Sequence, residues 1–352
     1  MRKALTSLVL AGLFVTVLAA PQPAAAQGDI EWVETAAIPD SANTVWRQAL
    51  AAAINPDDYV CEPGLIDQWI GELLSATDFA TLDTLFMFGS PDWPIVYKLF
   101  FDNDDTDEFI GVDGRYTREH AQRERDLINF WDVPLDGVDL YGMHGAVIAD
   151  DAKMVPVVQF LFGVSATEAQ GIVDLVQATI VSDPTIGYDW PLFSFNAVAF
   201  GPDPLKIVMG DGLIAFFEDT RLANNGVDVI YAHEMAHHIQ GVLDVFAEEP
   251  SPEATRRTEL MADAFSVYFL VHARGAAFNK HRALDTFEVS FISGDCAFDS
   301  PGHHGTPNQR RLAAEWGADV ARDRPQGQIK SAASMVALFD AELPTIVAPD
   351  AP

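Results

Sequence analysis

Two stretches, His233-Glu-Met-Ala-His237 and Glu259-Leu-Met-Ala-Asp263, decide how this chain of 352 residues is expected to fold and to work. Side chains four residues apart lie one turn apart on the same face of a helix. His233 and His237 can therefore present two imidazoles to one metal ion. The surrounding residues 229–242 are largely apolar, and a buried helix that carries two histidines and a glutamate needs a compensating interaction. A bound metal ion supplies one.

The second stretch supplies the remaining ligand. A helix is expected from Pro252 to Arg274, and its Glu259 and Asp263 are also four residues apart on an otherwise apolar face. We assign Glu259 as the third metal ligand and Asp263 as an acceptor for an imidazole N–H group. In the alternative interpretation, Glu259 is a surface carboxylate that pairs with the neighbouring Arg256 or Arg257.

The chemistry of this set points to hydrolysis. Two imidazoles and one carboxylate form a ligand set typical of catalytic Zn²⁺, and Glu234 is placed to take a proton from a zinc-bound water. The metzincin class is excluded, because it needs glycine and histidine where this chain has Gln240 and Leu243. The sequence therefore predicts a zinc-dependent metallopeptidase. The alternative is a non-catalytic secreted binding protein whose zinc site is structural or vestigial.

The two motifs together resemble those of the gluzincins, zinc peptidases with two histidines from HExxH and a glutamate from a later helix. Residues 190–315 carry the likeness, which includes similarity to small soluble relatives of the CAAX prenyl proteases and to bacterial neutral zinc metallopeptidases. The resemblance implies a minigluzincin-like core: a small β-sheet with an edge strand, the HExxH helix and the glutamate-bearing helix. It also implies a peptide or protein substrate bound along that edge strand. The strand residues are Asn196, Ala197, Val198 and Ala199.

A donor that stabilises the transition state is still needed. His304, Tyr268 and His272 are the alternatives, and His304 lies in a Gly302–Arg310 segment similar to one in the bacterial neutral peptidases. His272 should face away from Glu259, because thirteen residues of helix rotate it by about 220°. We favour His304, and we expect Arg310 to anchor its segment to a carboxylate.

The overall pattern predicts an α+β protein that is mostly helical. Short apolar runs at 194–200 and 206–209, separated by Gly201-Pro-Asp-Pro204, predict two strands. A helix is expected at 211–220. A longer one, from Val227 to Phe246, carries the first metal-binding motif.

Four segments are expected along the chain. They are a signal peptide at 1–26, a mainly helical region of unknown role at 27–150, a zinc metallopeptidase domain at 151–340 and a flexible tail at 341–352. An inhibitory or substrate-selecting role is an open alternative for the second segment. The signal peptide is inferred from a basic start, an apolar run at 4–20 and small residues before Gln27. It predicts export to the periplasm or the extracellular space.

Composition sets further limits. The hydrophobic content of 49% excludes a disordered chain, and the formal net charge of −31 argues against binding to nucleic acid. No apolar run after the leader is long enough for a membrane span. Cys61 and Cys296 are the only cysteines, and an oxidising compartment would allow a disulfide between them. Two free thiols are the alternative.

Overall fold

The computed structural model describes residues 55–103, 108–202, 204–246, 251–300, 302–323 and 327–351. The predicted signal peptide, 1–26, and residues 27–54 of the following region lie outside this set. The described residues form twelve α-helices and one three-stranded mixed sheet, so the chain is α+β and mostly helical, as predicted.

The chain divides into two compact units, and each is described by itself. Among the described residues, unit 1 contains those within 65–121 and 138–224, and unit 2 contains those within 55–64, 122–137 and 225–351. The predicted peptidase domain at 151–340 stays a prediction. Residues 341–346, which were expected to begin a flexible tail, instead form the last turns of helix α14 (Ala332–Ile346).

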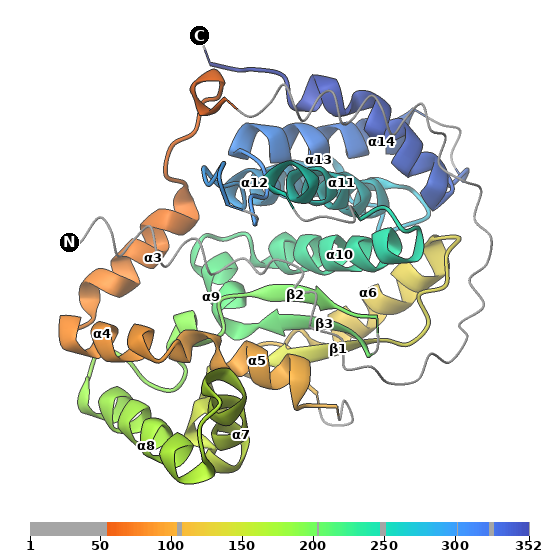
Figure 1. The fold of residues 1–352 in the computed structure, drawn as a ribbon. Coiled ribbons are helices and arrows are strands. Elements are labelled where there is room, and N and C mark those ends of the chain that lie inside the picture. The colour runs from red at the N-terminus through yellow and green to blue at the C-terminus, as the bar shows by residue number, and fades with distance from the viewer. Residues whose placement is uncertain are drawn as a thin grey trace. The chain divides into compact units, whose positions relative to one another are not determined.

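The sheet of unit 1 has the strand order β1-β3-β2 (Figure 1). β1 (Val138–Met143) runs parallel to β3 (Leu205–Gly210), whereas β2 (Ala197–Phe200) is antiparallel to β3 and forms an edge of the sheet. The predicted pair of strands is confirmed, with β2 starting three residues later than expected, and β1 was not predicted. The register runs from Val138–Leu205 to Met143–Gly210 and from Ala197–Met209 to Phe200–Lys206.

Six helices complete unit 1. α5 packs against β1 and β3, α9 follows β3 without a loop, and α7 and α8 form an adjacent pair (Figure 1). Local sequence explains the start of α8, where the Ser165 side chain accepts from the Glu168 amide and the Glu168 carboxylate accepts from the Ser165 amide. The bounds are α3 (Leu65–Ala76), α4 (Phe79–Met87), α5 (Trp93–Phe100), α7 (Asp151–Phe162), α8 (Ala166–Ser182) and α9 (Asp211–Asp219).

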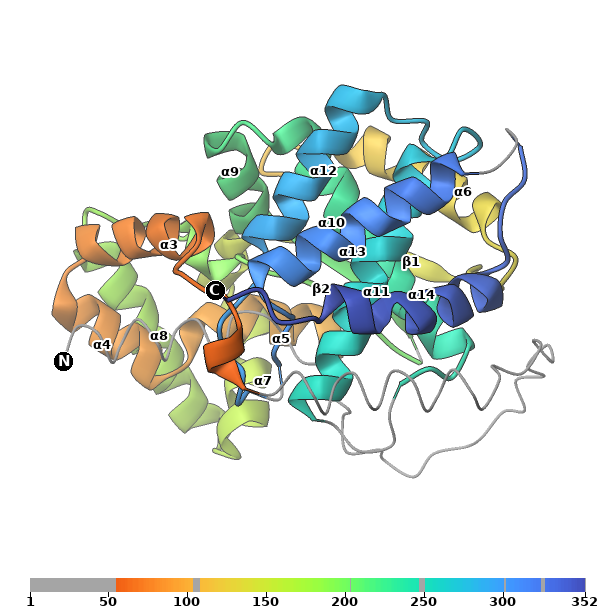
Figure 2. The same cartoon turned by 90° about the horizontal axis from the view of Figure 1, so that it is seen from above.

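Unit 2 is built around α11, which contacts α12, α13 and α14 (Figures 1 and 2). Every residue of α11 from 256 to 270 is buried, so this helix forms the centre of the unit's core. The bounds are α6 (Thr117–Phe130), α10 (Ala223–Val242), α11 (Pro252–Val271), α12 (Lys280–Ile292), α13 (Pro307–Arg322) and α14 (Ala332–Ile346). The first residues of α6 and α10 belong to unit 1. Within the described part of the chain, no helix combines the length and apolarity that crossing a membrane requires.

Local signals explain the start of α11, and a close approach explains its end. The Ser251 hydroxyl accepts from the Ala254 amide at 3.1 Å, and Pro252 occupies the first turn. The helix ends three residues before the predicted Arg274, because the chain folds back over its last turn. A Cβ atom on Gly275 would lie only 2.0 Å from the Phe269 carbonyl oxygen, so this position requires glycine.

α10 begins and ends four residues earlier than the sequence predicts. Its Asn225 side chain donates to Asp285 and accepts from Arg282, both at 2.6 Å, so tertiary contacts keep this asparagine inside the helix. At the other end Asp244 takes a left-handed conformation with φ of 53°, which stops the helix.

Candidate metal centre

The candidate metal centre lies in unit 2, on α10 and α11. α10 carries His233 and His237, and α11 carries Glu259. All three side chains are buried, with residue exposures of 4%, 8% and 7%. The two helices are tied together nearby, where the Ser266 hydroxyl donates to the Val229 carbonyl at 2.9 Å.

The ligand atoms have the spacing that a single small cation needs. The two Nε2 atoms lie 3.2 Å apart, and the Glu259 carboxylate oxygens lie 3.2 Å from His233 Nε2 and 3.4 Å from His237 Nε2. Bonds of 2.0–2.1 Å in a tetrahedral zinc site place neighbouring ligand atoms about 3.3 Å apart. His233, His237 and Glu259 could therefore hold a metal ion. Three ligands would leave one tetrahedral position open.

Hydrogen bonds orient the ring of His237. Gln240 donates its amide N–H to the Thr258 carbonyl at 2.7 Å, which turns its Oε1 toward His237 Nδ1, 2.9 Å away. Since Oε1 can only accept, His237 carries its hydrogen on Nδ1, and Nε2 keeps a lone pair for a metal ion. Gln240 therefore has a supporting role that the sequence did not reveal.

Asp263 orients His233 and is itself held from α13. Its Oδ1 lies 3.1 Å from His233 Nδ1. Arg310 donates to both carboxylate oxygens at 2.7 and 2.8 Å, and its third nitrogen donates to the Ser293 carbonyl at 3.0 Å. The expected contact of Asp263 with an imidazole is present, and Arg310 does anchor its segment to a carboxylate.

Negative charge at the site favours a cation. Burial disfavours ionisation of Glu259, yet the adjacent His237 and His304 hold its pKa well below the usual range. Burial also disfavours a charged His233, but Asp263 and Glu259 raise its pKa to about 10. The two carboxylates that would keep a proton on His233 would also stabilise a divalent metal ion. On binding, the metal ion would replace that proton.

Glu234 follows the first ligand directly and is also buried, with 8% of the residue exposed. A carboxylate next to a metal ligand in a dry environment is suited to accept and return a proton. Its position in the helix matches the base of an HExxH site.

His304 reaches the neighbourhood of Glu259 from the loop between α12 and α13. Asp295 fixes it, because one carboxylate oxygen accepts from the His304 amide at 2.8 Å and lies 3.0 Å from the ring Nδ1. The other oxygen lies 2.5 Å from His303 Nδ1. Gly305 permits the turn, with φ of 102°. Asp295 was not identified from the sequence, where only its neighbour Cys296 drew notice.

Glu259 is 7% exposed, so it is not the surface carboxylate of the alternative interpretation. Three of the alternative residues also have partners elsewhere. The Tyr268 hydroxyl accepts from the Lys330 amide at 2.8 Å, and His272 Nε2 lies 3.1 Å from the Gln328 carbonyl oxygen. Arg257 binds both oxygens of Asp340 at 2.8 Å. None of these contacts involves Glu259.

The remaining predicted residues lie in separate places. Asn196 directly precedes β2, its carbonyl accepts from the Gly210 amide at 2.9 Å, and Ala197, Val198 and Ala199 lie within β2 in unit 1. In unit 2, Cys61 and Cys296 form the predicted disulfide, with their Cα atoms 5.8 Å apart.

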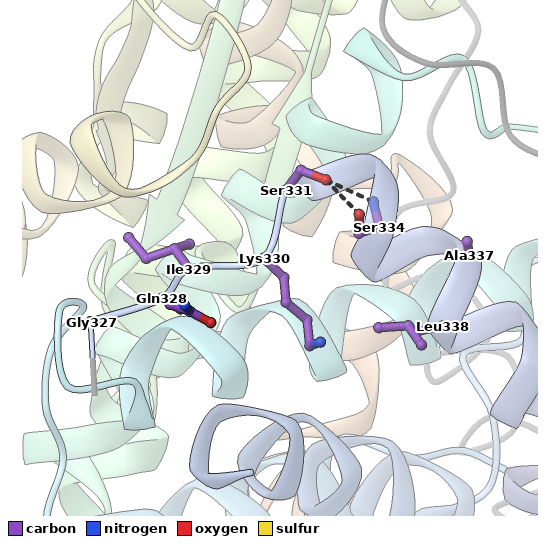
Figure 3. Close-up of a pocket in the computed structure, with 8 residues that line it drawn as sticks. All are labelled: Gly327, Gln328, Ile329, Lys330, Ser331, Ser334, Ala337 and Leu338. Atoms are coloured by element: carbon purple, nitrogen blue, oxygen red, sulfur yellow. Dashed lines mark hydrogen bonds between the residues drawn. The ribbon is translucent and has the colours of Figure 1, made fainter. Parts of the chain in front are cut away.

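A pocket of about 780 Å³ lies at the start of α14 (Figure 3). It is lined by residues 327–331, Ser334, Ala337 and Leu338. The Ser331 hydroxyl accepts from the Ser334 amide at 3.1 Å, as the normal capping of a helix start, and donates to the Ser334 hydroxyl at 2.7 Å. No ligand residue of the metal centre lines this pocket, and we assign it no role.

Comparison with known proteins adds no assignment: no protein-family model, curated protein or solved structure matches this chain. Function is therefore inferred from the residues and their geometry.

Proposed function

We propose that this chain is a zinc-dependent metallopeptidase, an endopeptidase that hydrolyses peptide bonds in a protein substrate. The observation that carries the proposal is that His233 Nε2 and His237 Nε2 lie 3.2 Å apart and face the two Glu259 carboxylate oxygens, one at 3.2 Å and the other at 3.4 Å. Structural zinc sites are usually closed by four protein ligands, whereas catalytic sites have three and leave room for water or substrate. The described ligand set has three.

Zinc, when bound, would act as a Lewis acid that polarises the scissile carbonyl and acidifies water. The protein's own residues would move the protons. Glu234 would accept a proton from the attacking water and deliver it to the leaving amine. His304, oriented by Asp295 at 3.0 Å, would donate a hydrogen bond to the oxygen on which negative charge develops.

The resemblance to gluzincins supports the same activity. In this proposal α10 and α11 form the helical part of a minigluzincin-like core, and β2 is the edge strand. A substrate in extended conformation would pair with the backbone of β2 through main-chain hydrogen bonds. We also propose that the protein is exported, on the pattern of residues 1–26.

Metal content is the first test. We expect the purified full chain to contain about one zinc ion per molecule by elemental analysis, and Glu259→Ala to lose most of it. Glu288→Ala is a matched control, because Glu288 is an exposed residue on α12. Equal zinc in Glu259→Ala and the control would contradict the ligand assignment.

Proteolysis of casein is the second test. Glu234→Gln removes the base but leaves the three ligands, so we expect zinc to be retained and cleavage to fall by about 10²- to 10⁴-fold. Glu288→Gln should cleave like the wild type. A wild type that binds zinc but cleaves no peptide would favour the structural or vestigial site instead.

A further inference from the structure

The loop that presents His304 depends on one carboxylate. This loop connects α12 to α13, and its residues 293–300 and 302–306 are described. Asp295 binds the backbone and ring of His304 and the ring of His303, and its own amide donates to the Gly305 carbonyl at 2.9 Å. The orientation of His304 is therefore set by where Asp295 lies.

The position of Asp295 is in turn fixed by a covalent bond next to it. The following residue, Cys296, is bonded to Cys61, which is 235 positions away in the sequence. The Cys61 sulfur also lies 3.5 Å from the Asp295 carbonyl oxygen. The disulfide thus contacts the backbone of Asp295, whose carboxylate orients His304, and it fixes the residue that follows Asp295.

The other end of the disulfide is firmly attached to the unit. The Tyr59 hydroxyl donates to the Val347 carbonyl at 2.9 Å, and the Val60 amide donates to the Asp350 carboxylate at 2.8 Å. The Asp350 amide donates back to the Asp58 carbonyl at 3.0 Å. Cys61 therefore sits on a segment bound to the C-terminal end of α14, and it can restrain the loop.

Solvent can reach this bond. Cys296 is exposed and Cys61 is half-buried. Exposed disulfides are generally easier for thiols to reduce and include the regulatory ones, whereas structural disulfides of secreted proteins typically resist reduction.

We propose that the Cys61–Cys296 disulfide is a redox-sensitive positioning device for His304, and this inference rests on the peptidase function proposed above. With the bond intact, Asp295 is held where it orients His304. Reduction by a dithiol releases the loop: a thiolate attacks one sulfur, and the second thiol resolves the mixed disulfide. The two cysteines gain two electrons and two protons, and the dithiol is oxidised to a disulfide.

Reduction should impair turnover without removing the metal ion. The ligands His233, His237 and Glu259 lie on α10 and α11, and neither helix carries a cysteine. A displacement of about 1 Å in a catalytic group can lower the rate by about 10²-fold. We expect kcat on casein to fall at least about tenfold after reduction, with zinc content unchanged.

The experiment uses the full chain in four forms: the wild type, Cys61→Ala/Cys296→Ala, Asp295→Asn, and the triple variant. Each is treated with or without dithiol, freed of reagent under anaerobic conditions, and checked by circular dichroism for an unchanged fold. The cysteine variant controls for the reagent, because dithiol should not alter it. Asp295→Asn tests whether the disulfide acts on His304 through Asp295. If it does, removing the disulfide as well has little further effect, and the triple variant should be less than about twofold slower than Asp295→Asn alone.

Three results would overturn the inference: full kcat after reduction, zinc lost in step with activity, or rate losses that multiply in the triple variant. Hydrogen–deuterium exchange provides a readout that does not depend on activity. The amide of His304, which donates to Asp295, should exchange faster after reduction, while α10 and α11 keep their protection. If the oxidised protein cleaves no peptide, the peptidase proposal fails, and unchanged exchange at His304 would separately refute the positioning role.

Discussion

Arg310→Met should destabilise the protein strongly. Arg310 is 3% exposed and donates to both oxygens of Asp263, which is 1% exposed. Methionine fills much of the same space but removes the guanidinium, which leaves the buried carboxylate with the imidazole of His233, 3.1 Å away. Removing one partner of a buried ion pair typically costs about 3–5 kcal/mol, so we expect a loss of that size in the free energy of unfolding.

A second substitution separates the charge effect from lost packing. Asp263→Asn in the Arg310→Met background removes the buried negative charge, so the double variant should be more stable than Arg310→Met alone. Arg311→Met is the matched control on the same helix, because Arg311 forms an exposed pair with Glu315. Exposed pairs contribute about 0–1 kcal/mol.

Urea denaturation followed by circular dichroism measures these differences. A metal chelator is present throughout, so that metal binding to the folded state does not contribute to the result. A loss of less than about 1 kcal/mol in Arg310→Met, as expected of the control, would contradict a buried ion pair of this strength. A double variant no more stable than Arg310→Met would contradict it as well.

Three further predictions follow from the contacts. Gln240→Leu removes the acceptor of His237 Nδ1 and should weaken zinc binding about 10- to 100-fold in a chelator competition, whereas Gln122→Leu, on the exposed face of α6, should bind zinc normally. Hydrogen bonds from Thr185 lower the pKa of Asp183 from its ordinary 3.8 to about 2. Asp183 therefore stabilises the fold above pH 3.8 and loses this effect as the pH falls to 2. The stability advantage of wild type over Asp183→Asn, up to about 2 kcal/mol at neutral pH, should vanish across that window in urea titrations, and a pH-independent difference would contradict it. Zinc at about 1,000 times its Kd should stabilise the protein by about 4 kcal/mol, and calorimetry that finds the same Tm with and without chelator would argue against metal binding.

Helical periodicity made most of the candidate site predictable. A spacing of four residues is enough to place His233 with His237, and Glu259 with Asp263, on common faces, whatever the rest of the fold does. The apolar surroundings of both motifs then indicate that these faces are buried. The structure brings the ligand atoms of His233, His237 and Glu259 within 4.8 Å of one another.

The supporting residues were harder to foresee, because their contacts are not periodic. Gln240 belongs to α10 but acts only because α11 places the Thr258 carbonyl opposite it. Asp295 orients His304 because an irregular loop returns to it after nine residues. A sequence pattern of fixed spacing does not identify contacts of this kind.

The same limit applies to β1. Its partner β3 begins 67 positions later, and parallel pairing leaves no tight turn between the strands to signal it. By contrast, β2 and β3 are joined by a short break with two prolines, which made both of them recognisable.

In the proposed function, metal binding and substrate specificity depend on different parts of this polypeptide. Every ligand atom, and every side chain found to orient one, comes from residues 225–352, while the strand proposed to receive substrate belongs to unit 1. The two properties can therefore diverge by independent mutations. A combinatorial library confined to residues 65–121 and 138–224 should yield proteins that cut new sequences and still load the same ion.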